Sequence, residues 1–334
     1  MMQDKELSPL KEKRDWRKLL LFAKVCITLL ILGYIYKTFT NEQKGVSDVW
    51  DIFKGVLNTE HAPFLVAMLF LVPVNWALES LKWRQLAQKV VPLTFWDAFR
   101  GTLTGLAMGV AAPAQLGDTI GRVAALKSDK RLQAIGAALV SNGIQFYVSI
   151  LGGALGWLYV QHDLQVDLTM RYGLNVLLIF LVIGVWFIML FRGRLISWNP
   201  KHIYLKKMQS YLQIIGAYTK RDLFLATLYG GIRYLVFLTQ FVLALYLFDF
   251  KLSLTTLSAC VALIFLAKTL VPAINVLGDL GLREFTALFV FKQYHLPPEQ
   301  VITATFLIWI MNVLGPILVG IYLIWKYKWR NLFR

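Results

Sequence analysis

Residues 113–122 read PAQLGDTIGR and residues 272–283 read PAINVLGDLGLR, so one short pattern occurs twice in a chain of 334 residues. Each copy contains Pro-Ala, then Leu-Gly-Asp, and then an Arg four residues after the Asp. The copies lie about 160 residues apart, close to half the chain length, and such self-similarity indicates an internal duplication. The chain is therefore expected to consist of two related halves, each built around one copy.

Both copies lie in or beside apolar stretches, residues 99–116 and 252–277, that Pro and Gly interrupt. The interruptions free backbone groups that lipid cannot satisfy, so these segments must face protein or a wet cavity. Each stretch is predicted to form a hairpin that enters the membrane and returns to the same side.

The whole chain has the composition of an integral membrane protein. Hydrophobic residues make up 57% of it and charged residues only 16%, whereas soluble domains carry about a quarter charged residues. Six apolar runs are close to the length that crosses a hydrocarbon core. The predicted spans are residues 19–36, 63–78, 132–160, 174–191, 223–247 and 301–325.

The net charge of +16 would suggest nucleic-acid binding in a soluble protein, but here it has to be sorted by side of the membrane. With a cytoplasmic N-terminus and two re-entrant hairpins, 25 of the 35 Lys and Arg residues fall in predicted cytoplasmic segments and seven in predicted outer segments. A full crossing by the first hairpin would move the basic loop at 192–221 outside, against the positive-inside bias. Two spanning arms per hairpin would preserve the count, so charge leaves the hairpin depth open.

The spans on either side of the repeated pattern also correspond. The span at Pro63 aligns with the one at Leu223, and the span at Leu132 aligns with the one ending at Trp325. Each half crosses the membrane three times. Because three is an odd number, the second half enters from the opposite face and is inverted relative to the first, as in many secondary transporters. The predicted fold is an all-α integral membrane protein with an inverted repeat. Each half has three transmembrane helices plus one re-entrant hairpin, giving six full spans and two hairpins, or eight spans by a looser count.

The domain boundaries follow from these assignments. A basic cytoplasmic segment is expected at residues 1–18, a single membrane domain at 19–327 and a basic cytoplasmic tail at 328–334. Within the membrane domain, the first repeat covers 19–160 and the second covers 171–327. Each repeat also has an amphipathic stretch that is expected to lie as a helix in the membrane interface, at residues 46–57 and 205–215.

The repeated pattern supplies the candidate binding site. Helices starting just after Gly117 and Gly278 would direct free N–H groups and a positive dipole end toward a central cavity. Arg122 and Arg283 lie on the same helices, and an Arg fork beside a helix N-terminus suits a phosphate or a carboxylate. The predicted substrate-binding residues are Pro113, Gly117, Asp118, Arg122, Arg233, Pro272, Gly278, Asp279, Arg283 and Glu284.

Asp118 and Asp279 also have a structural interpretation, because each can form a salt bridge with the Arg four residues later. Glu284 has no counterpart in the first copy. It could bind a proton or a cation, or hold Arg283, and the structural role is favoured slightly.

Two further charged positions lie within apolar spans. Arg233 follows Gly230 and Gly231, which leave space for a cavity or for close backbone approach. Glu79 is expected to be an interfacial partner of Lys82 near the cytoplasmic end of its span.

Several chemistries are missing from the sequence. It contains no GxxxxGK[ST] phosphate loop and no GxSxG element, and its His and Cys residues are scattered. We therefore expect neither an enzyme nor a protein that needs a cofactor or metal.

The hairpin motifs resemble those of the flippase-type membrane domain of the lysylphosphatidylglycerol synthase family. The resemblance extends over nearly the whole chain in span order and loop size, but only the two short motifs are specific. The matching residues are Pro113, Gly117, Asp118 and Arg122 in the first motif, and Pro272, Gly278, Gly281, Arg283 and Glu284 in the second.

This resemblance implies a flippase-like or scramblase-like transporter that moves a lipid with a polar or anionic headgroup across a bacterial inner membrane. The chain ends at Arg334 without a soluble aminoacyl transferase domain, so lysyl transfer is not expected. Membrane lipids are the expected partners and nucleic acid is not. Alternatives are a transporter of a small anionic solute and a non-transporting, lipid-binding partner of an envelope enzyme. The lipid, the direction, the energy coupling and the oligomeric state, including a homo-oligomer, stay open.

Overall fold

The computed structural model describes residues 60–111, 116–126, 128, 133–197, 202, 213–248, 250–270 and 282–326, with eight scattered positions between 22 and 55. Helices and their connecting turns account for all of this part of the chain. The elements are α3 (Ala62–Ala87), α4 (Phe95–Ala111), α5 (Leu116–Ala124), α6 (Ala134–Val160), α7 (Leu168–Leu190), α8 (Arg192–Ser197), η2 (Gln213–Ala217), α10 (Lys220–Tyr246), α11 (Leu254–Leu270), α12 (Leu282–Lys292), α13 (Pro298–Trp309), the π turn η3 (Ile310–Leu314) and α14 (Gly315–Lys326).

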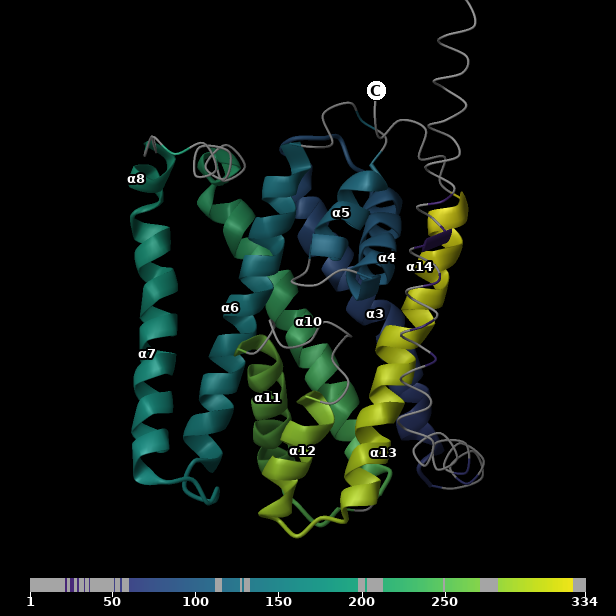
Figure 1. The fold of residues 1–334 in the computed structure, drawn as a ribbon, viewed down its shortest axis with the longest axis vertical. Coiled ribbons are helices and arrows are strands. Elements are labelled where there is room, and N and C mark those ends of the chain that lie inside the picture. The colour runs from purple at the N-terminus through teal and green to yellow at the C-terminus, as the bar shows by residue number, and fades with distance from the viewer. Residues whose placement is uncertain are drawn as a thin grey trace, which may run out of the picture.

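In the part of the chain that the structure describes, four segments are long and apolar enough to cross a membrane, namely α3, α6, α10 and the continuous run from α13 to α14. A further apolar helix, α7, stands at the edge of the bundle beside α6 (Figure 1). The structure is therefore that of an all-α, multi-pass membrane protein. These five segments match five predicted spans, although α3 continues past the predicted end at residue 78 to Ala87.

The remaining predictions of elements fall largely outside the described residues. Phe22, Leu29 and Tyr36 in the first predicted span are helical and exposed. Most of the two amphipathic stretches, and all of residues 1–18 and 328–334, lie outside the described part of the chain.

Helices α4 and α5 pack side by side with their backbones in contact. A Cβ atom on Gly121 of α5 would lie 2.7 Å from the Cα atom of Gly105 in α4. Such a distance leaves no room for a side chain, so only glycine permits this approach. The close contact places the side chains of α5 directly over α4.

Helices α11 and α12 form the second pair that contains a copy of the repeated pattern. Figure 1 shows α4 and α5 toward one end of the molecule, and α11 and α12 toward the other. The described part of α4 runs to Ala111 and that of α11 runs to Leu270, and the first residues of the two copies, Pro113 and Pro272, lie outside the described residues.

The centre of the bundle is formed by α3 and α10, which cross in extensive contact. Around them, α6 packs on α11, α14 packs on α4 and α13 packs on α12. The run from α13 to α14 is interrupted by the π turn just before Gly315 and Pro316. Because π turns interrupt the regular ladder of backbone hydrogen bonds, this one is a local irregularity inside a membrane-spanning segment.

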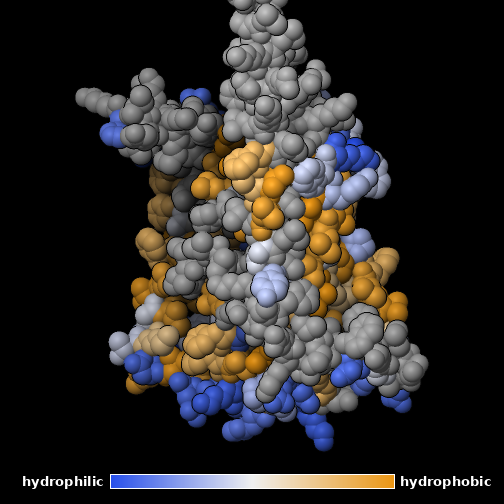
Figure 2. Space-filling model, turned by 45° about the vertical axis from the view of Figure 1, so that its right-hand side comes forward, coloured by the Kyte–Doolittle hydropathy of each residue, from blue (hydrophilic) through white to orange (hydrophobic). Residues whose placement is uncertain are grey.

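The surface agrees with a membrane environment. In Figure 2, hydrophobic side chains cover the middle of the molecule, and hydrophilic ones gather at its lower end and near the top. Large apolar side chains on α7, including Phe180 and Leu190, are mostly exposed. A soluble protein seldom exposes such a continuous apolar surface, whereas lipid is a suitable solvent for it.

Candidate functional site

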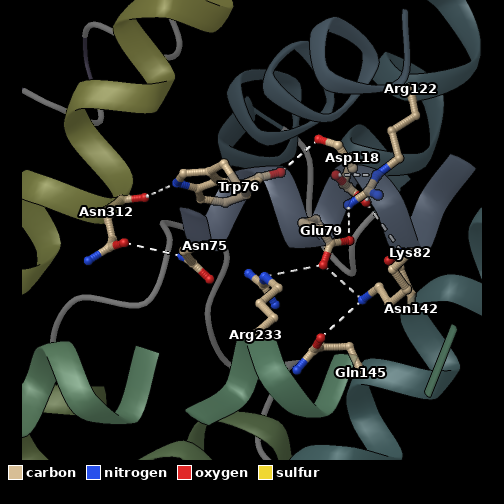
Figure 3. A network of polar contacts seen from close by, with 11 residues as sticks. Asn75, Trp76, Glu79, Lys82, Asp118, Arg122, Asn142, Gln145, Arg233 and Asn312 are labelled. Atoms are coloured by element: carbon tan, nitrogen blue, oxygen red, sulfur yellow. Dashed lines mark hydrogen bonds and ion pairs between the residues drawn. The ribbon is translucent and has the colours of Figure 1, made fainter. Parts of the chain in front are cut away.

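A buried carboxylate, Glu79 of α3, lies at the centre of a group of charged side chains (Figure 3). Its Oε2 atom is 2.8 Å from Lys82 Nζ and 3.2 Å from Arg233 Nε. Its Oε1 atom is 2.9 Å from Arg122 Nη2. One carboxylate therefore joins α3, α5 and α10.

Asp118 of α5 is the second acid of this group. The Nε atom of Arg122 donates to both oxygens of Asp118, each at 2.9 Å. We call Glu79, Lys82, Asp118, Arg122 and Arg233 the Glu79 cluster. Two side chains of α6 complete its polar surroundings. Asn142 donates to Asp118 at 3.4 Å, and the side-chain oxygen of Gln145 accepts from Lys82 Nζ at 3.0 Å.

The spacing of residues within single helices explains two of the ion pairs in the cluster. Glu79 and Lys82 are three residues apart on α3, and Asp118 and Arg122 are four apart on α5, so each pair lies on one helix face. The small side of α4 makes room for the second pair. A Cβ atom on Gly105 would lie 2.7 Å from Asp118 Oδ1 and 2.8 Å from Arg122 Cγ.

The Glu79 cluster has more cations than anions. It holds three cations and two carboxylates, so its formal net charge is +1. The side chains of Glu79, Lys82 and Arg122 are each no more than 5% exposed. Charges removed from water are tolerated when they are paired, and ionisable groups inside a membrane domain commonly mark a functional site. A buried excess of positive charge can bind an anion.

Aromatic rings lie beside both arginines. The guanidinium of Arg122 lies 5.8 Å from the ring centroid of Trp83, and that of Arg233 lies 5.4 Å from the ring centroid of Trp76. Such cation–π contacts stabilise a guanidinium away from water. The indole N–H of Trp76 in turn donates to the backbone oxygen of Asn312 at 3.2 Å.

Asn312 belongs to the π turn and connects it to α3. The Nδ2 atom of Asn75 donates to Asn312 Oδ1 at 3.2 Å, and both residues are buried. Through Trp76 and Arg233, polar contacts continue from the π turn to Glu79 (Figure 3).

The second copy of the pattern contributes a different arrangement. Arg283 and Glu284 of α12 are both buried, and Arg283 Nε lies 3.5 Å from Glu284 Oε1. The ion-pair partners of Glu79 within the described residues are Lys82, Arg122 and Arg233, so Arg283 is not in the cluster.

The structure brings Asp118, Arg122 and Arg233 together, and it confirms the salt bridge between Asp118 and Arg122. Gly117 is buried against α4, but it lies within α5, because that helix begins at Leu116. The other predicted site residues, Pro113, Pro272, Gly278 and Asp279, lie outside the described residues.

The burial of Glu79 inside the bundle was not predicted. Glu79 does pair with Lys82, but both side chains are buried in the bundle, and Lys82 is not a residue of a cytoplasmic loop. The reason is that α3 continues to Ala87, with Trp83 and Leu86 also buried. The apolar residues Trp83 and Leu86 after Glu79 were the sequence signal that the helix continues and that Glu79 is buried. No comparable sequence signal indicated that Asn142, Gln145 and Asn312 belong to the site.

In the described part of the chain, no group of three or more His, Cys, Asp and Glu residues is placed to hold a metal ion. The guanidinium and ammonium groups of the Glu79 cluster are hydrogen-bond donors of the kind that bind anions.

Comparison with known families identifies the domain. A family described as "Lysylphosphatidylglycerol synthase TM region" matches residues 21–320, which include the whole Glu79 cluster. No curated protein and no solved structure gave a match. Because the family match covers most of the chain, the protein belongs to the family of the lysylphosphatidylglycerol synthase transmembrane region.

Proposed function

We propose that this protein is a flippase-like or scramblase-like transporter that moves a lipid with a polar or anionic headgroup between the leaflets of the membrane. The observation that carries the proposal is the Glu79 cluster, a buried site with net charge +1 formed by α3, α5 and α10. Membership of the family of the lysylphosphatidylglycerol synthase transmembrane region supports the same proposal.

The position of the cluster fits this function. Lipid headgroups are anionic or polar, and they cannot pass through hydrocarbon without polar partners. A site that offers arginine donors within a membrane-spanning bundle supplies such partners. Substrate sites of secondary transporters commonly lie at the interface between repeats, where broken segments meet.

The proposed architecture is an inverted repeat in which the α4/α5 pair and the α11/α12 pair are re-entrant hairpins. Two observations support it. Each pair flanks or includes one copy of the repeated pattern in the sequence, and the pairs lie toward opposite ends of the molecule (Figure 1). Under this proposal Arg122 and Arg283 approach the substrate from opposite sides.

The proposed location is a bacterial inner membrane, with both termini in the cytoplasm. The basic segment at 192–221 would then face the cytoplasmic leaflet and attract anionic lipids to the protein. We propose lipids as the partners of the protein, and transport without covalent chemistry as its activity.

The test is a flipping assay with the purified full chain in liposomes. Headgroup-labelled phospholipids are reconstituted in both leaflets, and a membrane-impermeant quencher reports how fast the inner label reaches the outer surface. The wild-type protein is expected to accelerate this exchange over protein-free liposomes.

The matched variants test whether the Glu79 cluster carries the activity. Replacing the pair Arg122 and Asp118 by Gln and Asn removes one charge of each sign, so the cluster keeps its net charge but loses its main donor. We expect flipping to fall at least about tenfold, which corresponds to losing about one charged hydrogen bond. Arg171→Gln, in the first turn of α7, removes a partly exposed arginine outside the cluster and should leave the rate unchanged.

Three results would contradict the proposal in different ways. Wild-type protein that accelerates no tested lipid would favour the non-transporting partner. Uptake of a small organic anion without lipid flipping would favour the solute transporter. Equal rates for the cluster variant and Arg171→Gln would show that transport does not use this site.

A further inference from the structure

The charge balance of the Glu79 cluster limits the ligands that it can take. In the described structure its three cations face two carboxylates, and no other ion pair to these five residues is present there. A net charge inside a membrane domain is costly, so the ligand that best neutralises it is favoured. A ligand with one negative charge brings the cluster to zero, whereas a ligand with two leaves it at −1.

Unused donors in the same place indicate that the ligand is a hydrogen-bond acceptor. Among the described residues, the Nη1 atom of Arg122 and the Nε1 atom of Trp83 are buried without a hydrogen-bond partner. The two groups are neighbours, because the guanidinium of Arg122 lies 5.8 Å from the ring centroid of Trp83. Buried N–H groups rarely stay unpaired. These two donors therefore point to a ligand that accepts hydrogen bonds beside Arg122 and Trp83.

Glu79 contributes more than Asp118 to the charge balance of the Glu79 cluster. It contacts all three cations, whereas Asp118 contacts Arg122 alone among them. A carboxyl group between three cations is stabilised in its charged form. The carboxylate of Glu79 therefore occupies the position of an anion and cancels part of the attraction that a ligand would experience.

We propose that the Glu79 cluster selects a monoanionic phosphodiester, and that Glu79 is the residue that sets this charge preference. The inference rests on the proposed function only in treating the cluster as the substrate site. A phosphodiester carries one negative charge, whereas a phosphomonoester carries nearly two at neutral pH because its second pKa is about 6. The shared chemistry fits both a lipid headgroup and a free phosphodiester.

The experiment measures binding instead of transport, so it can succeed where the flipping assay fails. The full chain in nanodiscs of zwitterionic lipid is titrated with glycerophosphoglycerol, a phosphodiester, and with glycerol 3-phosphate, a phosphomonoester. Wild-type protein is expected to bind the diester at least about tenfold more tightly at neutral pH.

The decisive variant is Glu79→Gln, which raises the net charge of the cluster to +2. It should remove or reverse the preference, with a gain of about tenfold or more for the monoester. Glu79→Asp keeps the charge and should keep the preference. Asp167→Asn removes one exposed carboxylate, and Asn is an equally good N-cap for α7, so this control should change neither affinity.

A second variant keeps the test valid if Glu79→Gln does not fold, which thermal unfolding of each variant will show. Asp118→Asn also raises the cluster to +2, but among the three cations it affects only the contact with Arg122, so the same shift is expected at a smaller size. An unchanged preference in a folded Glu79→Gln or Asp118→Asn protein would overturn the inference. So would a wild-type protein that binds the monoester as tightly as the diester.

The two sources of the ligand are distinguished by a second titration with short-chain phosphatidylglycerol and phosphatidic acid. The same charge preference is expected in this series. Lipids that bind at least about tenfold more tightly than their headgroups would identify a lipid as the ligand. Equal affinities would identify a free phosphodiester.

Discussion

The α4/α5 pair and the α11/α12 pair carry the same short pattern, but their arginines have different surroundings. Arg122 of α5 contacts two carboxylates, Asp118 and Glu79, and shares the second with Lys82 and Arg233. Arg283 of α12 lies near the carboxylate of its own neighbour, Glu284, at 3.5 Å. Among the described residues, the ion pairs of Arg122 therefore reach two other helices through Glu79, whereas that of Arg283 is with its neighbour on the same helix.

The difference comes from the long helices and not from the repeated pattern. Helix α3 supplies Glu79 to Arg122, whereas α10 has no acidic residue after Asp222 in its first turn. Among the described residues, the carboxylate that pairs with three cations consequently lies beside α5. In a protein with two related halves, similar motifs can thus have unequal roles when their packing partners differ.

The largest expected effect on the free energy of unfolding is at Glu79, and Glu284 is the acid with which it is compared. Glu79→Ala leaves three cations, of which Lys82 and Arg122 are buried, without their shared partner and should lower the free energy of unfolding by about 3–5 kcal/mol. Glu284→Ala should cost less, about 1–3 kcal/mol, because its ion pair with Arg283 is longer. Denaturant unfolding in detergent micelles measures both. Equal losses would show that the two sites are energetically equivalent.

A smaller effect is expected where α5 touches α4. Gly105→Ala places a Cβ atom 2.7 Å from Asp118 Oδ1 and 2.8 Å from the Asp118 backbone oxygen, so the helices must separate, at a cost of about 1–3 kcal/mol. Gly231→Ala is the matched control, because nothing lies within 4 Å of its Cβ position. Thermal unfolding should show the opposite sign there, since alanine favours a helix over glycine by up to about 1 kcal/mol. Loss of stability in both variants would contradict the close approach.

The polar contact between α3 and the π turn should contribute less. Asn75 and Asn312 form an uncharged hydrogen bond, and such bonds inside membrane domains are worth about 0.5–1.5 kcal/mol. A double-mutant cycle with Asn75→Leu and Asn312→Leu should give a coupling free energy in this range. A coupling near zero would mean that Trp76, which donates to the Asn312 backbone, holds the turn alone.

The smallest effect is expected at the end of the molecule near the α11/α12 pair. Tyr294 donates to Asp163 at 2.9 Å in an exposed position. Tyr294→Phe should change the free energy of unfolding by about 0.5 kcal/mol or less, because water can replace this bond. A loss comparable to that of Asn75→Leu would show that this end is as tightly held as the centre.

Much of the fold could be predicted from the sequence because the deciding signals are local. Apolar runs of sufficient length located five spans that the structure describes, with ends displaced by a few residues. Helical spacing predicted the bridge between Asp118 and Arg122. The end of α3 was missed because its last turns carry Glu79, Lys82 and Arg84 among apolar residues, and charged side chains normally indicate the end of a span.

The sequence by itself determined that this chain is a helical membrane protein, since the length and composition of its apolar runs allow no other solvent for them. It also determined that an acid and an arginine share one face of α5, because that depends only on a spacing of four residues. Only the tertiary structure decided that Glu79 is the shared partner of Lys82, Arg122 and Arg233. The reason is that α5 and α10 reach Glu79 through contacts between segments far apart in the chain, which no local pattern encodes.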